Sequence, residues 1–266
     1  MKNNLTTSIK GLNALICGST SGIGYATANE FVKRGAKVTL FARNQNKLKE
    51  IIKKFNDLNN QKCDYIVGDF NDPKNIELEL NKHLLKFNKY HILINNSGGP
   101  KGGPILEASN SEFLETFNRH LVCNHVISKA LIPFMKKDNY GRIINIISTS
   151  VKQPIAGLGV SNTIRGAVAS WAKTMSFEVA EMGITLNNIL PGYIETERLN
   201  SIIEFKAKSN NQTKDSIINQ MRSQIPAQRF GSAKEIAMAI AFLSSPAAGY
   251  INGVSLAVDG GRLTSI

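Results

Sequence analysis

The sequence has little cysteine and no histidine pattern that suits a metal. Only 3 cysteines occur in 266 residues, and they form no Cys-x-x-Cys pair. Neither a disulfide framework nor a zinc site is indicated, so we expect small core residues at these positions. Metal-ligand spacing is also missing around the histidines, and no metal site is predicted. The residues concerned are Cys17, Cys63, Cys123, His83, His91 and His125.

The sequence also lacks long apolar runs and is short of acidic residues. No run could span a bilayer, and the N-terminal MKNNLTTSIK lacks the apolar core of a signal peptide, so we expect a cytoplasmic protein with no membrane association. The formal net charge is +12, which favours anionic partners. The lysines are scattered over predicted helices without interleaved aromatic residues, so nucleic-acid binding is only a minor alternative.

Short apolar runs alternate with longer helical patterns, which is typical of a parallel sheet covered on both faces. The length suits one compact domain. We therefore predict a single doubly wound α/β domain over residues 1–266, with three layers and a sheet of seven strands. These strands are expected at residues 13–17, 37–41, 65–67, 92–95, 143–148, 185–190 and 255–258.

Local signals mark the helix starts and one irregular region. Asp72 before Pro73 predicts a capped helix, and the spacings Ser109 to Glu112 and Ser232 to Glu235 fit capping boxes. The polar stretch from Glu195 to Gln224 lies between the sixth strand and the last helix. It is either a substrate lid or a surface excursion, and its position favours the lid.

A glycine-rich loop, CGSTSGIG, follows the first predicted strand and precedes a helical pattern. Such a loop lets the backbone approach a pyrophosphate, which the N–H groups of the helix N-terminus then bind. This context predicts a Rossmann-type dinucleotide site. Its loop residues are Gly18, Ser19, Ser21, Gly22, Ile23 and Gly24.

The second strand ends in FARN, without the acidic residue that would accept the ribose hydroxyls of NAD. Arg43 and Asn44 occupy that place instead. A basic residue suits the 2′-phosphate of NADP, so NADP(H) is the expected cofactor. The alternative is that Arg43 is only a solvated residue at a helix start.

Several motifs together resemble the short-chain dehydrogenase/reductase family from end to end. They are G-x-x-x-G-x-G, NNSG at residues 95–98, the serine that ends IINIIS, PGYIET at 191–196, GSAKEIAMAIAFLSS and YINGVSLAVDGG, in the order of the family. The RIINIIS strand and the C-terminal part look most like bacterial 3-oxoacyl-[acyl-carrier-protein] reductases.

This resemblance implies roles for residues outside the glycine loop. Asp69, followed by Phe70, would lie against the adenine ring, and Asn95 would stabilise the central sheet beside the cofactor. It also implies a homotetramer or a dimer. Further cofactor contacts are implied at Ser97, Gly98, Pro191, Gly192, Ile194 and Thr196.

The family's chemistry uses an asparagine, a serine and a Tyr-x-x-x-Lys pair, and here only the serine is kept. Counting without gaps from GRIINIIS places Ser148 at the serine, Ser161 at the tyrosine and Arg165 at the lysine. His120 falls at the asparagine, although Asn118 or Asn124 fits if the register slips.

These replacements keep part of the chemistry. Arg165 can bind the nicotinamide ribose and stabilise a developing alkoxide, but it does not readily exchange a proton. Ser161 is a poor general acid, because an aliphatic hydroxyl is much less acidic than a phenol. Lys152, His120 and Tyr193 are alternative proton donors.

The sequence therefore favours an NADP(H)-dependent carbonyl oxidoreductase that resembles 3-oxoacyl-[acyl-carrier-protein] reductase. Its substrate would be a small carbonyl compound or an acyl thioester. The alternative is an impaired relative that binds NADP(H) without turnover, as a sensor or as a partner in a hetero-oligomer.

Overall fold

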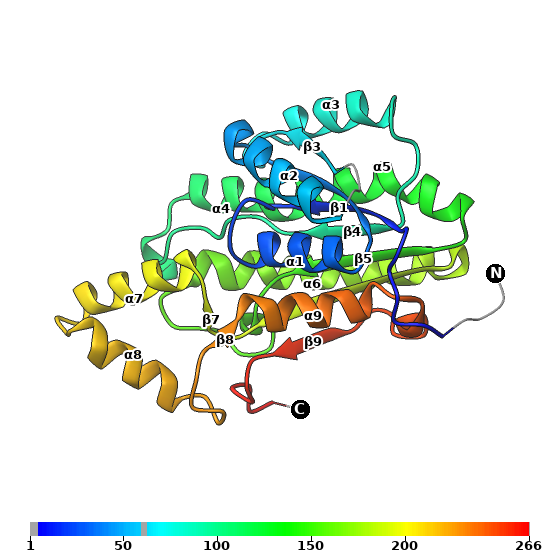
Figure 1. The fold of residues 1–266 in the computed structure, drawn as a ribbon. Coiled ribbons are helices and arrows are strands. Elements are labelled where there is room, and N and C mark those ends of the chain that lie inside the picture. Colours follow the sequence, from blue (N-terminus) through cyan, green and yellow to red (C-terminus); the bar gives the residue numbers. More distant parts are fainter. Residues whose placement is uncertain (1–4, 60–62, 266) are drawn as a thin grey trace.

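A computed structural model describes residues 5–59 and 63–265. Its centre is a parallel sheet with the strand order β3-β2-β1-β4-β5-β6-β9 (Figure 1). The predicted doubly wound α/β domain with seven strands is thereby confirmed. The strands are β1 (Asn13–Cys17), β2 (Lys37–Ala42), β3 (Asp64–Val67), β4 (Ile92–Asn95), β5 (Gly141–Ile146), β6 (Ile184–Pro191) and β9 (Ser255–Val258).

Helices cover both faces of this sheet because its strands are apolar on both sides. One face packs against α1 (Gly22–Lys33), α2 (Gln45–Asn59) and α9 (Ala233–Leu243), through a core that includes Phe31, Phe55 and Ile240. The other face packs against α3 (Pro73–Leu84), α5 (Cys123–Lys137) and α6 (Gly159–Val179). Cys17, Cys63 and Cys123 are free and buried, as expected of small core residues.

The helix starts follow the predicted capping chemistry. The Asp72 carboxylate accepts hydrogen bonds from the backbone N–H groups of Lys74 and Asn75 at the start of α3. Capping boxes are present at Ser109 before α4 (Asn110–Phe117) and at Ser232 before α9. A π-helical segment, η2 (Asn118–Val122), joins α4 to α5.

The fifth strand differs in position from the predicted 143–148. It spans Gly141–Ile146, and Ser148 caps the 3-10 helix η3 (Thr149–Val151) by accepting a hydrogen bond from the Ser150 N–H. Serine competes for backbone groups in this way, which ends the strand before the hydroxyl. Ser148 is thus placed just beyond the carboxyl end of the strand.

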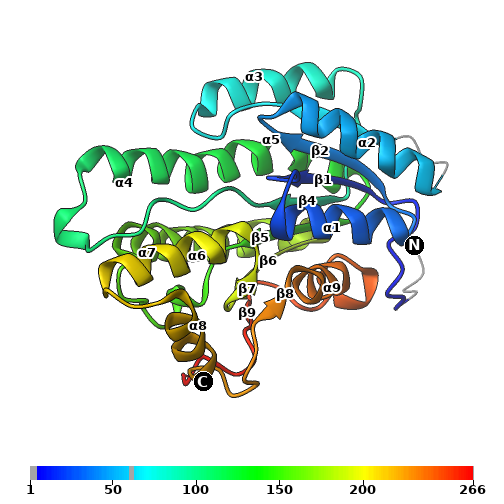
Figure 2. The same ribbon diagram turned by 60° about the vertical axis from the view of Figure 1, so that its left-hand side comes forward.

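The segment after β6 forms a projection of its own. It contains β7 (Ile194–Glu195), α7 (Glu197–Ser209) and α8 (Lys214–Ser223), and β7 pairs with β8 (Gly231–Ser232). Both helices extend beyond the sheet in Figures 1 and 2 and share a small apolar core. Across residues 5–59 and 63–265, no helix has the length and apolar character needed to cross a membrane.

Candidate active site

A cavity of about 690 Å³ lies at the carboxyl ends of the parallel strands. Its lining comes from the loops after β1 to β6, together with residues 118–122, α6 and the start of α7. The strand order reverses between β1 and β4, and ligands of open α/β sheets bind at such a switch point. The cavity therefore lies where this type of fold binds its ligand.

The glycine loop forms one wall of this cavity. Gly18 has φ +57°, and a Cβ atom there would lie 2.7 Å from the Asn96 backbone oxygen. Asn96 holds the loop, because its Nδ2 donates to the backbone oxygens of Cys17 and Gly18, at 3.3 and 3.2 Å. Only glycine permits this close approach and left-handed backbone without strain.

The N-terminus of α1 opens onto the same space. Its N-cap residue, Ser21, makes no side-chain capping bond, so the first N–H groups of the helix are left for a ligand. Gly22 has φ +52° and keeps side-chain atoms away from that end. This cradle fits a diphosphate, which supports the dinucleotide site predicted from the loop.

Arg43 lines the adjoining part of the cavity, at the end of β2. Asp69 and Phe70, which follow β3, line it as well. Asn44 does not line the cavity, and its side chain accepts a hydrogen bond from the Lys47 N–H at 3.0 Å at the start of α2. The donor set therefore fits a nucleotide with an added phosphate, as in NADP(H).

Most of the predicted cofactor contacts line the cavity, and four do not. Ser19 and Asn95 are buried below it, and Gly24 packs against the Gly18 backbone. Asn95 Nδ2 donates to Asn145 Oδ1 at 2.9 Å, and Asn145 Nδ2 donates to Asn188 Oδ1 at 2.9 Å, so this amide chain links β4, β5 and β6. Those four residues are Ser19, Gly24, Asn44 and Asn95, and the lining ones are Gly18, Ser21, Gly22, Ile23, Arg43, Asp69, Phe70, Ser97, Gly98, Arg165, Pro191, Gly192, Ile194 and Thr196.

The structure brings Ser148, Ser161 and Arg165 together in the lining of one cavity. Arg165 is buried and its Nη1 donates to the Ile146 backbone oxygen at 2.7 Å, which ties the helix α6 to the end of β5. Burial lowers the pKa of the Arg165 guanidinium to about 10, and the charge of Arg198 adds to that shift. Arg165 therefore keeps its positive charge at neutral pH.

His120 is buried beneath the cavity, on η2. Its Nδ1 lies 2.7 Å from the Ser97 hydroxyl, and Nε2 is buried with no hydrogen-bond partner among the described residues. Burial, and then the charges of Arg165, Arg119 and Arg198, hold the pKa of His120 well below its ordinary value. The imidazole is consequently neutral.

The two other candidate proton donors lie differently. Lys152 is exposed and is not among the residues that line the cavity. Tyr193 lines the cavity, but it is buried and its hydroxyl accepts a hydrogen bond from Arg262 Nη2 at 3.2 Å. The Arg262 guanidinium also lies over the Tyr193 ring, 4.4 Å from its centroid.

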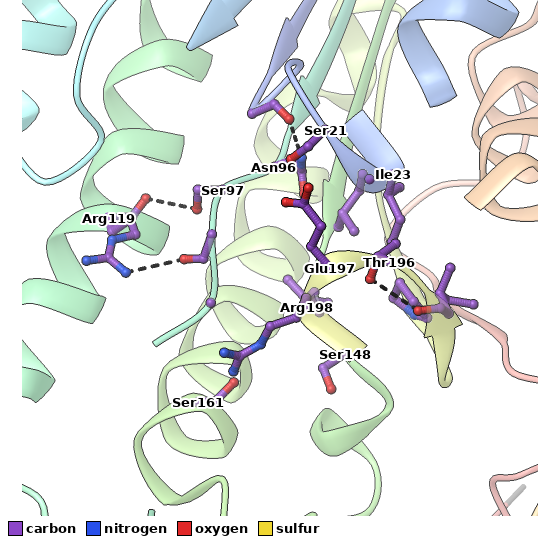
Figure 3. A pocket seen from close by; sticks show the side chains of 18 of the residues that line it. Ser21, Ile23, Asn96, Ser97, Arg119, Ser148, Ser161, Thr196, Glu197 and Arg198 are labelled. Carbon is purple, nitrogen blue, oxygen red and sulfur yellow. Dashed lines mark hydrogen bonds between the residues drawn. The ribbon is translucent and has the colours of Figure 1, made fainter. Parts of the chain in front are cut away.

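Two further arginines, Arg119 and Arg198, line the cavity and were not expected there from the sequence. Arg119 Nε donates to Asn71 Oδ1 at 2.7 Å, and Arg198 Nη2 donates to the Pro100 backbone oxygen at 2.7 Å. Figure 3 shows Arg198 directed toward Ser161, with Glu197 directed the other way, toward Ser21. Glu197 and Arg198 directly follow PGYIET, and this position could have pointed to them. No local sequence feature marks Arg119.

The fold and the cavity define a protein of the doubly wound α/β class with a dinucleotide site. A family model described as enoyl-(acyl carrier protein) reductase matches residues 18–262. The chain belongs to the short-chain dehydrogenase/reductase family.

Similar proteins cover almost the whole chain. The 3-oxoacyl-[acyl-carrier-protein] reductase FabG of Salmonella typhimurium is 34% identical over 254 residues, 96% of this chain and 98% of that protein. The NADPH-dependent reductase BacG of Bacillus subtilis is 30% identical over 255 residues, 95% of this chain and 98% of that protein. A crystal structure of L-sorbose reductase from Gluconobacter frateurii, complexed with NADPH and L-sorbose, aligns with a TM-score of 0.91 and 28% identity, over 98% of this chain and 99% of that one.

Proposed function

We propose that this protein is an NADP(H)-dependent carbonyl reductase that converts a ketone group to an alcohol. One observation carries the proposal: Ser148, Ser161 and Arg165 line the same cavity as the glycine loop and Arg43. FabG and BacG are both reductases, which supports the direction of the reaction. The name of FabG, a 3-oxoacyl-[acyl-carrier-protein] reductase, suggests a 3-oxoacyl thioester as one substrate to test.

NADP(H) is the cofactor. The N–H groups at the start of α1 bind its diphosphate, and Arg43 binds the 2′-phosphate. Asp69 and Phe70 lie along the adenine half of the cavity, and Pro191, Gly192, Ile194 and Thr196 lie along the nicotinamide half. The bound nicotinamide supplies the hydride for the reduction.

The carbonyl oxygen of the substrate lies between the two serine hydroxyls. Ser148 Oγ accepts from the Ser150 N–H at 3.1 Å, so its own proton is left to donate. Ser161 Oγ has no protein partner among the described residues, and Ser161 lines the cavity. Both hydroxyls donate to the oxygen, and the positive charge of Arg165 stabilises the negative charge that develops on it.

The reduction adds a hydride to the carbonyl carbon and a proton to the oxygen. We assign that proton to water, relayed by the Ser161 hydroxyl. His120 is neutral and buried, Lys152 is exposed outside the lining, and the Tyr193 hydroxyl is paired with Arg262. A relay of this kind is slower than transfer from a tyrosine, because a positioned general acid contributes about 10² to 10⁴ in rate.

The segment from Glu195 to Gln224 is proposed as the substrate lid. Glu197, Arg198, Leu199 and Ile202 of α7 line the cavity, while α8 packs against α7 and contributes no lining residue. Closure of such a segment excludes water from the reacting groups.

We also propose a homotetramer, or a dimer, in which α4, α5 and α6 form the contact. Leu114 on α4 and Phe177 on α6 are 65% and 70% exposed, and a contact through these helices would cover both side chains. Light scattering after size-exclusion chromatography measures the assembly directly.

The proposed reaction is tested by measuring NADPH oxidation at high protein concentration. The readout is the loss of NADPH absorbance. The panel starts with acetoacetyl thioesters and small ketones, and NADPH binding is measured in parallel by fluorescence. Turnover that is lost in both Ser148→Ala and Arg165→Met supports the proposal. Tight NADPH binding without turnover across the panel would instead indicate a cofactor-binding sensor or a partner in a hetero-oligomer.

A further inference from the structure

The cavity lining is rich in arginine. Its lining contains four arginines and only two acidic residues, a difference of two positive charges. The arginines are Arg43, Arg119, Arg165 and Arg198, and the acids are Asp69 and Glu197. Among the described residues, none of these four arginines forms an ion pair with a carboxylate.

The arginines divide between the two halves of the cavity. Arg43 follows β2, and Arg119 donates to Asn71, two residues beyond Asp69, so both lie on the adenine side. Arg198 lies on the side of Ser161 (Figure 3). Arg165 is four residues after Ser161 on α6, close enough to Arg198 for its pKa to be lowered by that charge. Two positive charges therefore meet where the substrate carbonyl is expected.

Arg198 is held over this half of the cavity by the loop after β4. Its Nη2 donates to the Pro100 backbone oxygen at 2.7 Å. A Cβ atom on Gly99 would lie 3.4 Å from the same Nη2, so the guanidinium packs directly on backbone that bears no side chain. The other donors of its fork are left without a protein partner among the described residues.

The two guanidinium groups destabilise one another. Burial lowers the pKa of Arg165, and the charge of Arg198 lowers it further. Glu197 does not relieve this repulsion, since it points away toward Ser21 and forms no ion pair among the described residues. A bound anion between Arg165 and Arg198 would relieve it, and a planar carboxylate matches the guanidinium fork.

We propose that the substrate is an oxo acid, whose free carboxylate binds to Arg198 with Arg165 beside it while its ketone lies at Ser148 and Ser161. This inference rests on the proposed function and narrows it to anionic ketones. A neutral ester or thioester of the same acid lacks the charge that the two arginines bind. The acid is accordingly the preferred substrate of the two forms.

The test compares acetoacetate, its methyl ester and an acetoacetyl thioester as substrates with NADPH. A second arm measures, by calorimetry, how 3-hydroxybutyrate and its methyl ester bind to the protein saturated with NADP⁺. Both arms use the wild type, Arg198→Gln and Arg198→Lys. Lys208→Gln is the matched control, because Lys208 is exposed on the same helix, α7, and does not line the cavity.

The expected result is that kcat/KM for the acid exceeds that for the ester and the thioester. Arg198→Gln lowers that value about 10- to 100-fold, mainly through KM, because a charge-assisted hydrogen bond is lost. The same variant leaves the value for the ester within about twofold, since the ester makes no such bond. Arg198→Lys restores part of the loss, and Lys208→Gln behaves as the wild type.

The two arms separate this inference from the proposed function. If the hydroxy acid binds through Arg198 but no ketone is reduced, the carboxylate site stands and the proposed reductase activity does not. If the ester or thioester is reduced as well as the acid, with Arg198→Gln unchanged, the reductase stands and the oxo-acid site is wrong. The absence of both binding and turnover would overturn both the oxo-acid site and the proposed reductase activity.

Discussion

The Nδ1 atom of His120 lies 2.7 Å from the hydroxyl of Ser97, and this contact joins the π-helical segment to the loop after β4. The other ring nitrogen is buried without a partner among the described residues. Burial and three nearby arginines hold the pKa of this histidine well below 6.5. His120, which the ungapped count predicts at the asparagine position of the family, is therefore a neutral, packed group.

This burial predicts a loss of stability in mild acid. The folded-state pKa of His120 lies below the unfolded value, so the unfolded chain takes up the proton first as the pH falls through about 6.5. The contribution to the free energy of unfolding is complete above that pH and declines below it. We expect the melting temperature, measured at a series of pH values, to fall less steeply below pH 6.5 for His120→Gln than for the wild type.

The exposed His125 provides the control for this experiment. The variant His125→Gln should keep the wild-type slope. His83 and His91, whose pKa values burial also lowers, remain in every variant and contribute equally. Identical slopes for His120→Gln and the wild type would contradict the prediction.

The position of Arg43 predicts the choice of cofactor. Arg43→Gln is expected to weaken NADPH binding about 10- to 100-fold, because it removes a charge-assisted bond to the 2′-phosphate. NADH has no such phosphate, and its affinity should change little. Fluorescence titration with both nucleotides measures the ratio of the NADPH affinity to the NADH affinity. The control is Lys47→Gln, at an exposed position of the neighbouring helix α2. An equal loss for NADPH and NADH would show that Arg43 acts only on the fold.

The open hydroxyl of Ser161 predicts a separation of activity from stability. With a ketone that the wild type reduces, Ser161→Ala should lower kcat about 10- to 100-fold, since one donor to the developing alkoxide is lost. The melting temperature should stay the same, because the hydroxyl has no protein partner among the described residues. Ser170→Ala, at an exposed position of α6, is the control. Unchanged kcat in Ser161→Ala would remove this residue from the proposed site.

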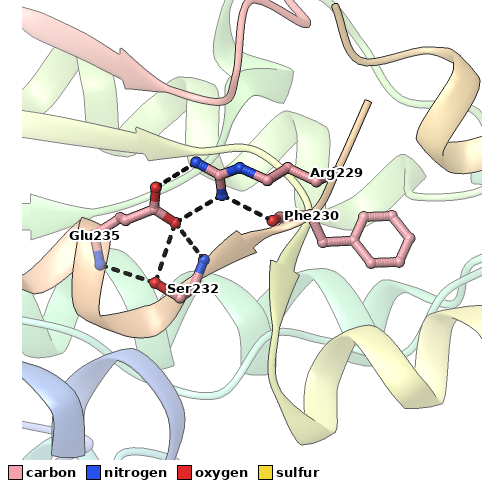
Figure 4. A network of polar contacts seen from close by, with 4 residues as sticks. All are labelled: Arg229, Phe230, Ser232 and Glu235. Carbon is pink, nitrogen blue, oxygen red and sulfur yellow. Dashed lines mark hydrogen bonds and ion pairs between the residues drawn. The ribbon is translucent and has the colours of Figure 1, made fainter. Parts of the chain in front are cut away.

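Arg229, Ser232 and Glu235 form a network at the start of α9 (Figure 4). Arg229 donates to both carboxylate oxygens of Glu235, at 3.0 and 2.6 Å, and Ser232 N donates to Glu235 Oε2 at 2.8 Å. Arg229 first, and then Ser232, lower the pKa of Glu235 to about 2. Since the folded pKa is depressed, the stabilisation is complete above the unfolded pKa of about 4.5 and is lost as the pH falls toward 2.

Glu235→Gln should therefore lose less stability than the wild type between pH 4.5 and 2. The pair is exposed, so added salt is expected to reduce the difference. Acid unfolding followed by circular dichroism at low and high salt measures both effects. Glu178→Gln, an exposed residue of α6, should follow the wild type. A wild-type acid profile in Glu235→Gln would show that the network adds nothing to stability.

Much of the fold could be predicted from local sequence features. The seven apolar runs each correspond to a strand, since strands buried on both faces need continuous apolar residues. The caps at Asp72, Ser109 and Ser232 form as expected, because a cap depends on residues only two or three positions apart. The end of β5 was placed two residues too late, where the Ser148 side chain ends the strand by bonding to backbone.

The sequence alone therefore determined the doubly wound sheet. Short spacings also marked the glycine loop, Arg43, Ser161 and Arg165 as candidate site residues. Only the tertiary structure decided that Arg198 and Arg119 join the cavity, that Lys152 stays outside it and that His120 is buried. These positions come from segments far apart in the chain, which the packing of helices on the sheet brings together. Burial and the charges of such distant neighbours then set the protonation of His120 and leave Arg165 beside Arg198 without a carboxylate.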